Sequence, residues 1–307
     1  MKIIDYIKKL FTKKGEQYMS KKALLVGVNK YAMGGSDLNG CVNDVLNIRD
    51  ILIAYQGFKA DDIRVLTDNR ATKNNIIERL NWLIKNAISG DKLVFHYSGH
   101  GSQIRDRNGD ELVDGMDELI CPHDMDWDNG TFIIDDDLQS IFKEVPNGVS
   151  LDVILDCCHS GTGTREIRSY NPNDEESSGK VITVRKSRYL QPPIDIMLRS
   201  EDDTEIRKIL KPNDTKNSVS TENGLNTMTH SLIAGCMDNQ TSADAYIGGN
   251  YNGALTYHLC KILRDHNGNI SRENLIGLLK NSLKLSNFEQ VPQLECPASK
   301  KLENLFT

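Results

Sequence analysis

The sequence predicts an α/β fold, with a central, mostly parallel β-sheet and helices on both of its faces. From Lys22 onward, short apolar runs alternate with amphipathic patterns of helical period. The apolar runs are rich in β-branched residues, as strands buried on both faces of a parallel sheet are. A chain of 307 residues is long enough for one large domain of this kind or two small ones.

Six segments are expected to be strands and five to be helices. The predicted strands are Ala23–Val28, Ile63–Thr67, Lys92–Tyr97, Glu118–Cys121, Leu151–Cys157 and Ser231–Cys236. The predicted helices are approximately Asp37–Tyr55, Thr72–Ser89, Asp136–Val145, Asn252–Asp265 and Ser271–Leu285. Asp37, Thr72 and Ser271 are residue types that cap helix N-termini, and each is expected to begin its helix. Active sites of such sheets lie beyond the carboxyl ends of the strands.

Two segments stand outside this alternation. Residues 1–19 form a basic extension whose apolar residues recur at helical spacing, so it resembles a surface helix for an anionic membrane. We favour a frayed extension instead, or a natural start at Met19. Residues 165–227 are polar, with weak periodicity, and are expected to form a long, mobile insertion in a single domain spanning 20–307.

Composition excludes several functional classes. The net charge of −6 and the pI of about 5.7 argue against a general nucleic-acid surface. No apolar run approaches the roughly 18 residues that span a bilayer, and the first residues do not resemble a signal peptide. Seven scattered cysteines in a long chain do not suggest a disulfide framework. We therefore expect a cytoplasmic protein without an organic cofactor.

Two motifs follow predicted strands and are expected to meet at one edge of the sheet. HYSGHG presents His100, and LDCCHSG presents Cys158. A cysteine beside a histidine is a nucleophile with its proton-transfer partner. The N–H groups of Gly101 and Cys158 are candidate donors to a developing oxyanion. Cys157 is expected to pack in the core.

Two other histidines lie close to these motifs along the chain. His96 and His100 have the spacing of a zinc motif, but the strand context and the missing glutamate argue against zinc, so His96 is expected in the core or behind the site. His159 is adjacent to Cys158, and neighbouring strand residues point to opposite faces. His100 is therefore the preferred base.

HYSGHGSQ, DGMDE and LDCCHSGTGTR together resemble the metacaspase and orthocaspase family of caspase-like cysteine peptidases. GVNKY, LNGCVNDV and GCMDNQTSADA extend the resemblance from about Lys22 to Leu285. The resemblance implies a caspase-like fold and an endopeptidase that cleaves protein or peptide substrates after arginine or lysine. It also implies a nucleophilic Cys158, His100 as general acid and base, and, by analogy, a monomer.

An acidic pocket would account for the basic preference. Asp156 lies two residues before Cys158, on the same face of the strand. Asp44, Cys41 and Ser98 match further pocket positions of the family. Carboxylates at the base of a slot favour a guanidinium, which they can bind in a bidentate manner.

Residues 106–137 contain twelve Asp or Glu residues and one basic residue, Arg107. Calcium is the natural counter-ion for such density, and the resemblance implies calcium activation. The candidate ligands are Asp114, Asp117, Asp135 and Asp136. The EF-hand spacing fails because Glu111 stands in place of the glycine, and Arg165 replaces a further acidic position of the family. A solvated acidic loop that attracts basic substrates is the alternative.

Autocleavage within the insertion, at Arg165, Lys180 or Arg188, is expected to open the active site to substrates.

A catalytically silent, caspase-like interaction module is the alternative function, although the intact Cys–His pair argues against it. A cysteine phosphatase is disfavoured, because Arg165 lies one residue too far from Cys158 for the C-x5-R loop. Amidohydrolysis of a non-peptide remains open on this chemistry.

Overall fold

A six-stranded sheet forms the centre of the protein in a computed structural model that describes residues 19–106, 115–158, 166–169, 183–197, 230–237 and 240–307. The strands run in the order β13-β10-β7-β3-β1-β2. Four of the five strand pairs are parallel, and only β13 runs antiparallel to its neighbour β10. Their bounds are Lys21–Gly27 (β1), Ile63–Thr67 (β2), Lys92–Ser98 (β3), Ser150–Asp156 (β7), Ser231–Ala234 (β10) and Gln293–Glu295 (β13).

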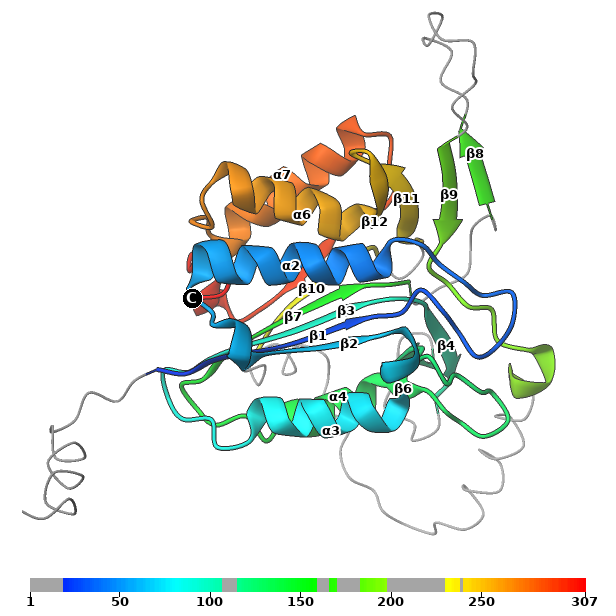
Figure 1. The fold of residues 1–307 in the computed structure, drawn as a ribbon, viewed down its shortest axis with the longest axis horizontal. Coiled ribbons are helices and arrows are strands. Elements are labelled where there is room, and N and C mark those ends of the chain that lie inside the picture. The colour runs from blue at the N-terminus through cyan, green and yellow to red at the C-terminus, as the bar shows by residue number, and fades with distance from the viewer. Residues whose placement is uncertain (1–18, 107–114, 159–165, 170–182, 198–229, 238–239) are drawn as a thin grey trace, which may run out of the picture.

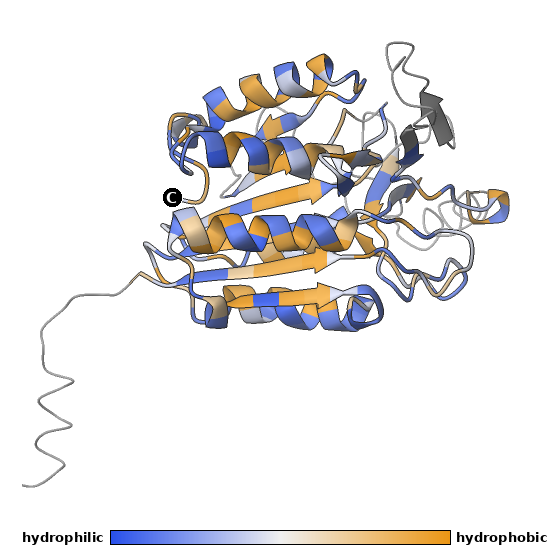
Figure 2. Ribbon diagram, turned by 45° about the horizontal axis from the view of Figure 1, so that its top comes forward, coloured by the Kyte–Doolittle hydropathy of each residue, from blue (hydrophilic) through white to orange (hydrophobic). Residues whose placement is uncertain are grey.

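Helices cover both faces of this sheet, as predicted. On one face lie α2 (Cys41–Gln56), α6 (Ala254–Asp265) and α7 (Arg272–Leu285), and on the other lie α3 (Lys73–Ile84) and α4 (Asp135–Phe142) (Figure 1). Alternate residues of β1 feed the two cores: Leu24 packs on the α3 side and Leu25 on the α2 side. Figure 2 shows the central strands as mostly hydrophobic, with hydrophilic segments at some ends, and the helices as two-sided. The α/β prediction is therefore confirmed.

The helix boundaries follow local capping chemistry. Thr72 and Ser271 accept hydrogen bonds from the backbone N–H groups of Asn75 and Asn274, so both predicted caps are confirmed. The prediction of a helix from Asp37 is wrong. Helix α2 begins at Cys41 after Gly40, and Asp37 instead accepts hydrogen bonds from the Lys30 side chain and the Tyr31 N–H group.

The predicted strand Glu118–Cys121 does not join the central sheet. It forms β5 (Met116–Ile120) of a separate antiparallel sheet with β4 (Gly101–Arg105) and β6 (Ile133–Ile134). The prediction failed because Glu118 and Leu119 alternate as in a half-buried antiparallel strand, whereas buried parallel strands are apolar throughout.

Part of the expected mobile insertion is a regular sheet. Strands β8 (Glu166–Ser169) and β9 (Thr183–Ser187) pair antiparallel, and β9 pairs with β11 (Ala243–Ile247), which in turn pairs with β12 (Asn250–Gly253). This sheet extends beyond the carboxyl ends of β3 and β7 (Figure 1). Residues 170–182 and 198–227 lie outside the described residues, as do residues 1–18.

None of the helices within the described ranges is both long enough and apolar enough to cross a bilayer.

Candidate active site

The two motifs meet at one edge of the sheet because their strands are neighbours. β3 and β7 pair in parallel with Ser98 opposite Asp156. His100 and Cys158 each follow two residues later, so both lie just beyond the carboxyl edge of the sheet. Both are buried, with 5% and 0% of their surface exposed.

The Cys158 thiol makes its hydrogen bonds with Ser242. The Ser242 N–H group donates to Sγ at 2.6 Å, and Sγ lies 3.3 Å from the Ser242 carbonyl oxygen. Ser242 precedes β11, so this strand fixes the orientation of the sulfur. Among the side-chain hydrogen bonds resolved in the described residues, none joins Cys158 to His100.

His100 is oriented by backbone groups and by tyrosines. Its Nε2 lies 2.7 Å from the Ser36 carbonyl oxygen, which makes Nε2 the protonated nitrogen and Nδ1 the basic one. Its N–H group donates to the Tyr31 hydroxyl, and its carbonyl oxygen accepts from the Tyr97 hydroxyl, both at 2.7 Å. Burial lowers the pKa of His100 to about 4, against the raising effect of the Ser36 carbonyl. The ring is therefore neutral at pH 7.

Arg188 fills a buried acidic pocket beside these two residues. Its guanidinium is fully buried and lies 2.8 Å from Asp44 Oδ2, 3.2 Å from Asp156 Oδ1 and 3.2 Å from Asp244 Oδ1. It also donates to the Ser98 hydroxyl and to the Asp156 carbonyl oxygen. Three carboxylates therefore surround one cation.

The carboxylates of this pocket are themselves held in place. Asp44 lies in the first turn of α2 and accepts the Gly253 N–H, and Asp156 accepts bonds from Ser242 and Thr256. Burial raises the pKa of Asp44 to about 7, opposed by the Arg188 guanidinium and reinforced by the Asp156 carboxylate. The surrounding carboxylates hold the pKa of Arg188 well above its usual value, although burial opposes them.

Two N–H groups converge on the Arg188 carbonyl oxygen. Gly101 N lies 2.9 Å from it and Cys158 N lies 3.3 Å from it. These are the two groups that the sequence predicts as oxyanion donors. A side chain at position 101 would collide with the Cys158 carbonyl oxygen, so only glycine allows this approach.

Residues on both sides of Arg188 are held as an extended segment. Before it, β9 pairs with β11, with Ser187 opposite Ala243 and Arg185 opposite Ala245. After it, the Leu190 N–H donates to the Gly101 carbonyl oxygen, and the Ser102 hydroxyl donates to the Leu190 carbonyl oxygen. The chain therefore crosses the site with the Arg188–Tyr189 peptide bond at the Cys–His pair.

The remaining predicted pocket residues and their neighbours are also near this site. Cys41 is buried at the start of α2, and the Arg188 charge acts on its thiol. His96 Nε2 lies 3.3 Å from the Thr256 hydroxyl, which donates to Asp156, so His96 lies behind the pocket as expected. Cys157 packs in the core, also as expected. His159, Arg165 and Lys180 lie outside the described residues.

The predicted calcium ligands come together only in part. Asp117 is 2% exposed on β5, and Asp135 and Asp136 begin α4 directly after β6, the neighbouring strand. Asp114 lies outside the described residues. Within the described part of the chain, no group of three or more His, Cys, Asp or Glu side chains is arranged to hold a metal ion. The calcium site stays a prediction, because one of its four expected ligands, Asp114, is not among the described residues.

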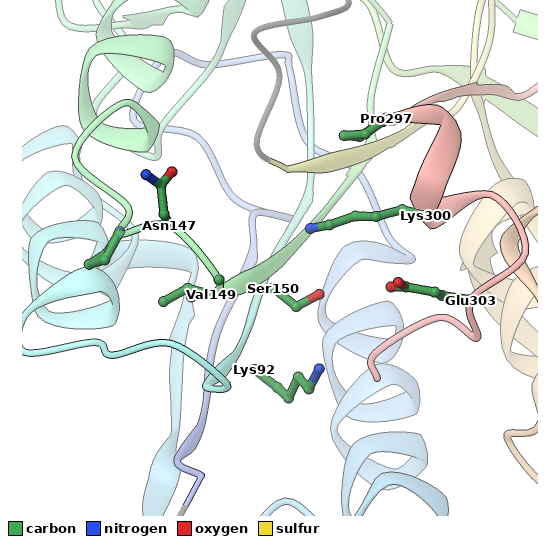
Figure 3. Close-up of a pocket in the computed structure, with 9 residues that line it drawn as sticks. Lys92, Asn147, Val149, Ser150, Pro297, Lys300 and Glu303 are labelled. Atoms are coloured by element: carbon green, nitrogen blue, oxygen red, sulfur yellow. The ribbon is translucent and has the colours of Figure 1, made fainter.

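A hollow of about 360 Å³ lies at the opposite edge of the central sheet (Figure 3). Lys92 and Ser150, which begin β3 and β7, line it together with Lys300 and Glu303 from the C-terminal segment. It is separated from His100 and Cys158 by the length of these strands. It is therefore not the active site.

Comparisons with known proteins agree with this geometry. The fold is shared with two solved structures: protein GSU0716 from Geobacter sulfurreducens (TM-score 0.63, 24% identity, covering 94% of this chain and 98% of that one) and Caspase-1 from Spodoptera frugiperda (TM-score 0.54, 12% identity, covering 91% and 86%). The molecule thus has a caspase-like α/β fold with a Cys–His pair at the carboxyl edge of its sheet.

Sequence comparison gives the family. Residues 21–165 match the model of the metacaspase peptidase C14 domain. Metacaspase-1 of Scheffersomyces stipitis is 34% identical over 90% of this chain and 70% of its own length, and that of Yarrowia lipolytica is 36% identical over 89% and 61%. The chain belongs to the metacaspase family of cysteine peptidases, and it spans about two thirds of the length of these relatives.

Sequence reasoning missed several groups at the site. The Ser36 carbonyl, which orients His100, carries no side-chain signal. Asp244 belongs to the string GCMDNQTSADA that supports the family resemblance, but its role depends on the pairing of β9 with β11. Tyr31 lies in GVNKY, and its hydroxyl contact with His100 spans 69 residues of chain.

Proposed function

We propose that this protein is an endopeptidase that cleaves after arginine or lysine, with Cys158 as nucleophile and His100 as general acid and base. The observation that carries the proposal is the position of Arg188. Its side chain lies among Asp44, Asp156 and Asp244, while its carbonyl oxygen accepts hydrogen bonds from Gly101 and Cys158. A substrate arginine would occupy the same pocket and present its carbonyl carbon to the thiolate.

The proposed reaction has two stages. The thiol proton passes to His100 Nδ1, and Sγ attacks the carbonyl carbon after the arginine. The carbonyl oxygen gains negative charge between the Gly101 and Cys158 N–H groups, and the C–N bond breaks as His100 protonates the leaving amine. His100 then takes a proton from water, which attacks the thioester and releases the carboxylate product and the thiol.

We propose that the first substrate is the protein itself, at the Arg188–Tyr189 bond. Of the three predicted autocleavage positions, Arg188 is the one within the described residues. With its peptide bond intact, Arg188 keeps other arginines out of the pocket, so the uncut protein is latent. The hydrogen bonds between Cys158 and Ser242 support latency, because they engage the sulfur that must attack.

The test uses fluorogenic peptides ending in arginine, lysine or aspartate, with wild-type protein and Cys158→Ala. We expect release of the fluorophore after arginine and lysine only, and none with the variant. Mass spectrometry of the wild-type protein should show a new N-terminus at Tyr189 that Cys158→Ala lacks. Self-cleavage by Cys158→Ala, or preference for aspartate, would refute the proposal.

Calcium activation is a further part of the proposal. The acidic segments at Asp117, Asp135 and Asp136 begin neighbouring elements, and Asp114 would supply a fourth carboxylate. We expect cleavage to rise with calcium and to fall with a chelator, and Asp117→Asn to weaken this response. Equal rates in calcium and in chelator would contradict this role and would favour the solvated acidic loop.

Covalent labelling of the nucleophile tests the alternative of a silent interaction module. An arginyl chloromethyl ketone should alkylate Cys158 in an active peptidase, and peptide mapping identifies the modified residue.

We further propose a monomer in a reducing, cytoplasmic compartment. The seven cysteines of the protein are all free thiols and all buried, and free thiols persist in a reducing compartment. Sedimentation equilibrium tests the monomer.

A further inference from the structure

The segment before Arg188 makes a second, separate contact through Arg185. In peptidase numbering, the residue whose carbonyl is attacked is P1, so Arg188 is P1 and Arg185 is P4. The Arg185 guanidinium carbon lies 4.2 Å from the centre of the Phe288 ring. The Arg185 Nη1 donates to the Asn287 carbonyl oxygen at 2.7 Å, and the Arg185 Nη2 donates to the Ser286 carbonyl oxygen at 3.4 Å.

We propose that Phe288 and the carbonyl groups of Ser286 and Asn287 form a subsite that selects arginine at P4. The inference rests on the proposed function, since it extends the specificity of the same site. Substrates of the cut enzyme would replace β9 along β11, and their P4 side chains would replace Arg185.

The chemistry of this subsite favours a planar cation. A guanidinium stacks on an aromatic ring while its edge donates hydrogen bonds to carbonyl oxygens, and an ammonium cannot do both in the same plane. Ser286 and Asn287 follow the C-terminus of α7, where the helix dipole is negative. Burial lowers the pKa of Arg185, and the exposed Glu289 carboxylate opposes this by favouring the cation.

The subsite is built into the fold and does not depend on surface side chains alone. Phe288 is 9% exposed and packs with Ala245, Ala254 and Leu283. Ala245 lies on β11 directly opposite Arg185, so the strand that aligns the substrate also carries the ring's support. The backbone of Asn287 has a left-handed φ of 59°, which turns the chain after α7.

The P3 residue offers an internal comparison. Among the described residues, the hydrogen bond resolved for Lys186 Nζ is 3.1 Å long and goes to the Asp37 carbonyl oxygen. No described aromatic ring stacks with it among the cation–ring contacts that the structure resolves. We therefore expect P3 to tolerate many residues and P4 to discriminate.

The experiment compares four peptides, X-Ala-Ala-Arg-aminomethylcoumarin, in which X is arginine, lysine, alanine or glutamate. We expect kcat/KM for arginine to exceed that for alanine by about tenfold, with lysine between them and glutamate lowest. Phe288→Leu keeps an apolar side chain but removes the ring, and should reduce the ratio to about twofold. Phe288→Tyr keeps the ring and should preserve the ratio.

Binding gives a second measurement that does not need turnover. The Cys158→Ala, Arg185→Ala, Arg188→Gln protein, in which neither Arg185 nor Arg188 occupies its subsite, should bind Arg-Ala-Ala-Arg peptides about tenfold more tightly than Ala-Ala-Ala-Arg peptides, and Phe288→Leu should remove the difference. Equal affinities would overturn the subsite even if cleavage after arginine is observed. Absence of any Cys158-dependent cleavage would instead refute the proposed function, and the binding ratio would still decide the subsite.

Discussion

Asp44 lies in the buried acidic pocket that the proposed function assigns to arginine. Its pKa is raised to about 7 while a guanidinium lies beside it, and removal of that cation takes away the main influence that lowers it. Binding of arginine therefore releases a proton from Asp44, and the affinity for arginine increases as the pH rises above 7.

The first prediction concerns this proton. In the Cys158→Ala, Arg188→Gln protein, an arginine-ending peptide should bind more tightly at pH 8.5 than at pH 6.5. Asp44→Asn should weaken binding by about tenfold to a hundredfold and remove the dependence on pH. Calorimetry in buffers of different ionisation enthalpy measures both effects. Asp50→Asn, an exposed position on the same helix, serves as control. An unchanged pH profile in Asp44→Asn would contradict the assignment.

His96 lies behind the pocket and supports it by staying neutral. Burial lowers its pKa to about 4, against the raising effect of Asp156. The unfolded chain, with an ordinary pKa near 6.5, binds the proton more readily, so this group costs stability as the pH falls from 6.5 toward 4.

We therefore predict that His96→Gln makes the acid side of the stability profile less steep, while His100, His230 and His258, whose pKa values burial also lowers to about 4, keep their own contributions. Between pH 7 and pH 5 the wild-type protein should lose about 2 kcal/mol of unfolding free energy through His96, and the variant should not. Urea unfolding at the two pH values measures the difference. His266→Gln changes an exposed histidine and should leave the profile as in the wild type.

At the scale of elements, the strands that precede His100 and Cys158, β3 and β7, could be predicted from the sequence. The strands that flank the active site, β9 and β11, could not. β3 and β7 are continuous apolar runs followed by glycine-containing turns, so their strand ends could be identified from local pattern. TVRKS and ADAYI lack an apolar run, and each is a strand because its neighbours supply its hydrogen bonds: β8 and β11 for β9, and β9 and β12 for β11.

The same pair of strands gives an element-scale prediction. Arg188 ties the end of β9 to α2, β7 and β11 through its three carboxylates. In the Cys158→Ala background, Arg188→Gln leaves these carboxylates without their cation. Removing one partner of a fully buried pair costs about 3–5 kcal/mol, and water entering the vacated pocket should reduce this to about 1–3 kcal/mol.

Urea unfolding tests this value, with Arg49→Gln at an exposed ion pair as control. Millimolar N-acetylarginine amide should restore part of the stability of Arg188→Gln and should not affect the parent. A variant as stable as its parent would show that the pocket gains nothing from the guanidinium.

At the scale of the whole molecule, a second buried arginine, Arg272, makes an ion pair at the end of the central sheet away from the active site. Arg272 begins α7 and lies 2.7 Å from Asp152 Oδ1 on β7, and it donates to the Asn304 carbonyl oxygen at 2.9 Å. Asp152 also accepts the Phe306 N–H. One ion pair thus joins the central sheet, a covering helix and the C-terminal segment.

Replacing the Arg272 guanidinium with a lysine ammonium should weaken the contacts among the central sheet, α7 and the C-terminal segment. We predict that Arg272→Lys lowers the unfolding free energy by about 2 kcal/mol, because lysine cannot bond in a bidentate manner to Asp152 while reaching the carbonyl groups. Differential scanning calorimetry measures the change. Arg264→Lys, at an exposed position on α6, should have no comparable effect.

Under the proposed function, the pairing of β9 with β11 also limits which bonds can be cut in other proteins. A polypeptide that takes the place of β9 must be extended through the residues before its arginine, and it must release that arginine side chain completely from its own structure. Helices and the interior strands of folded proteins satisfy neither condition. Cleavage should therefore fall in linkers and unfolded stretches, so that folded partners are divided at a few places and survive as intact domains.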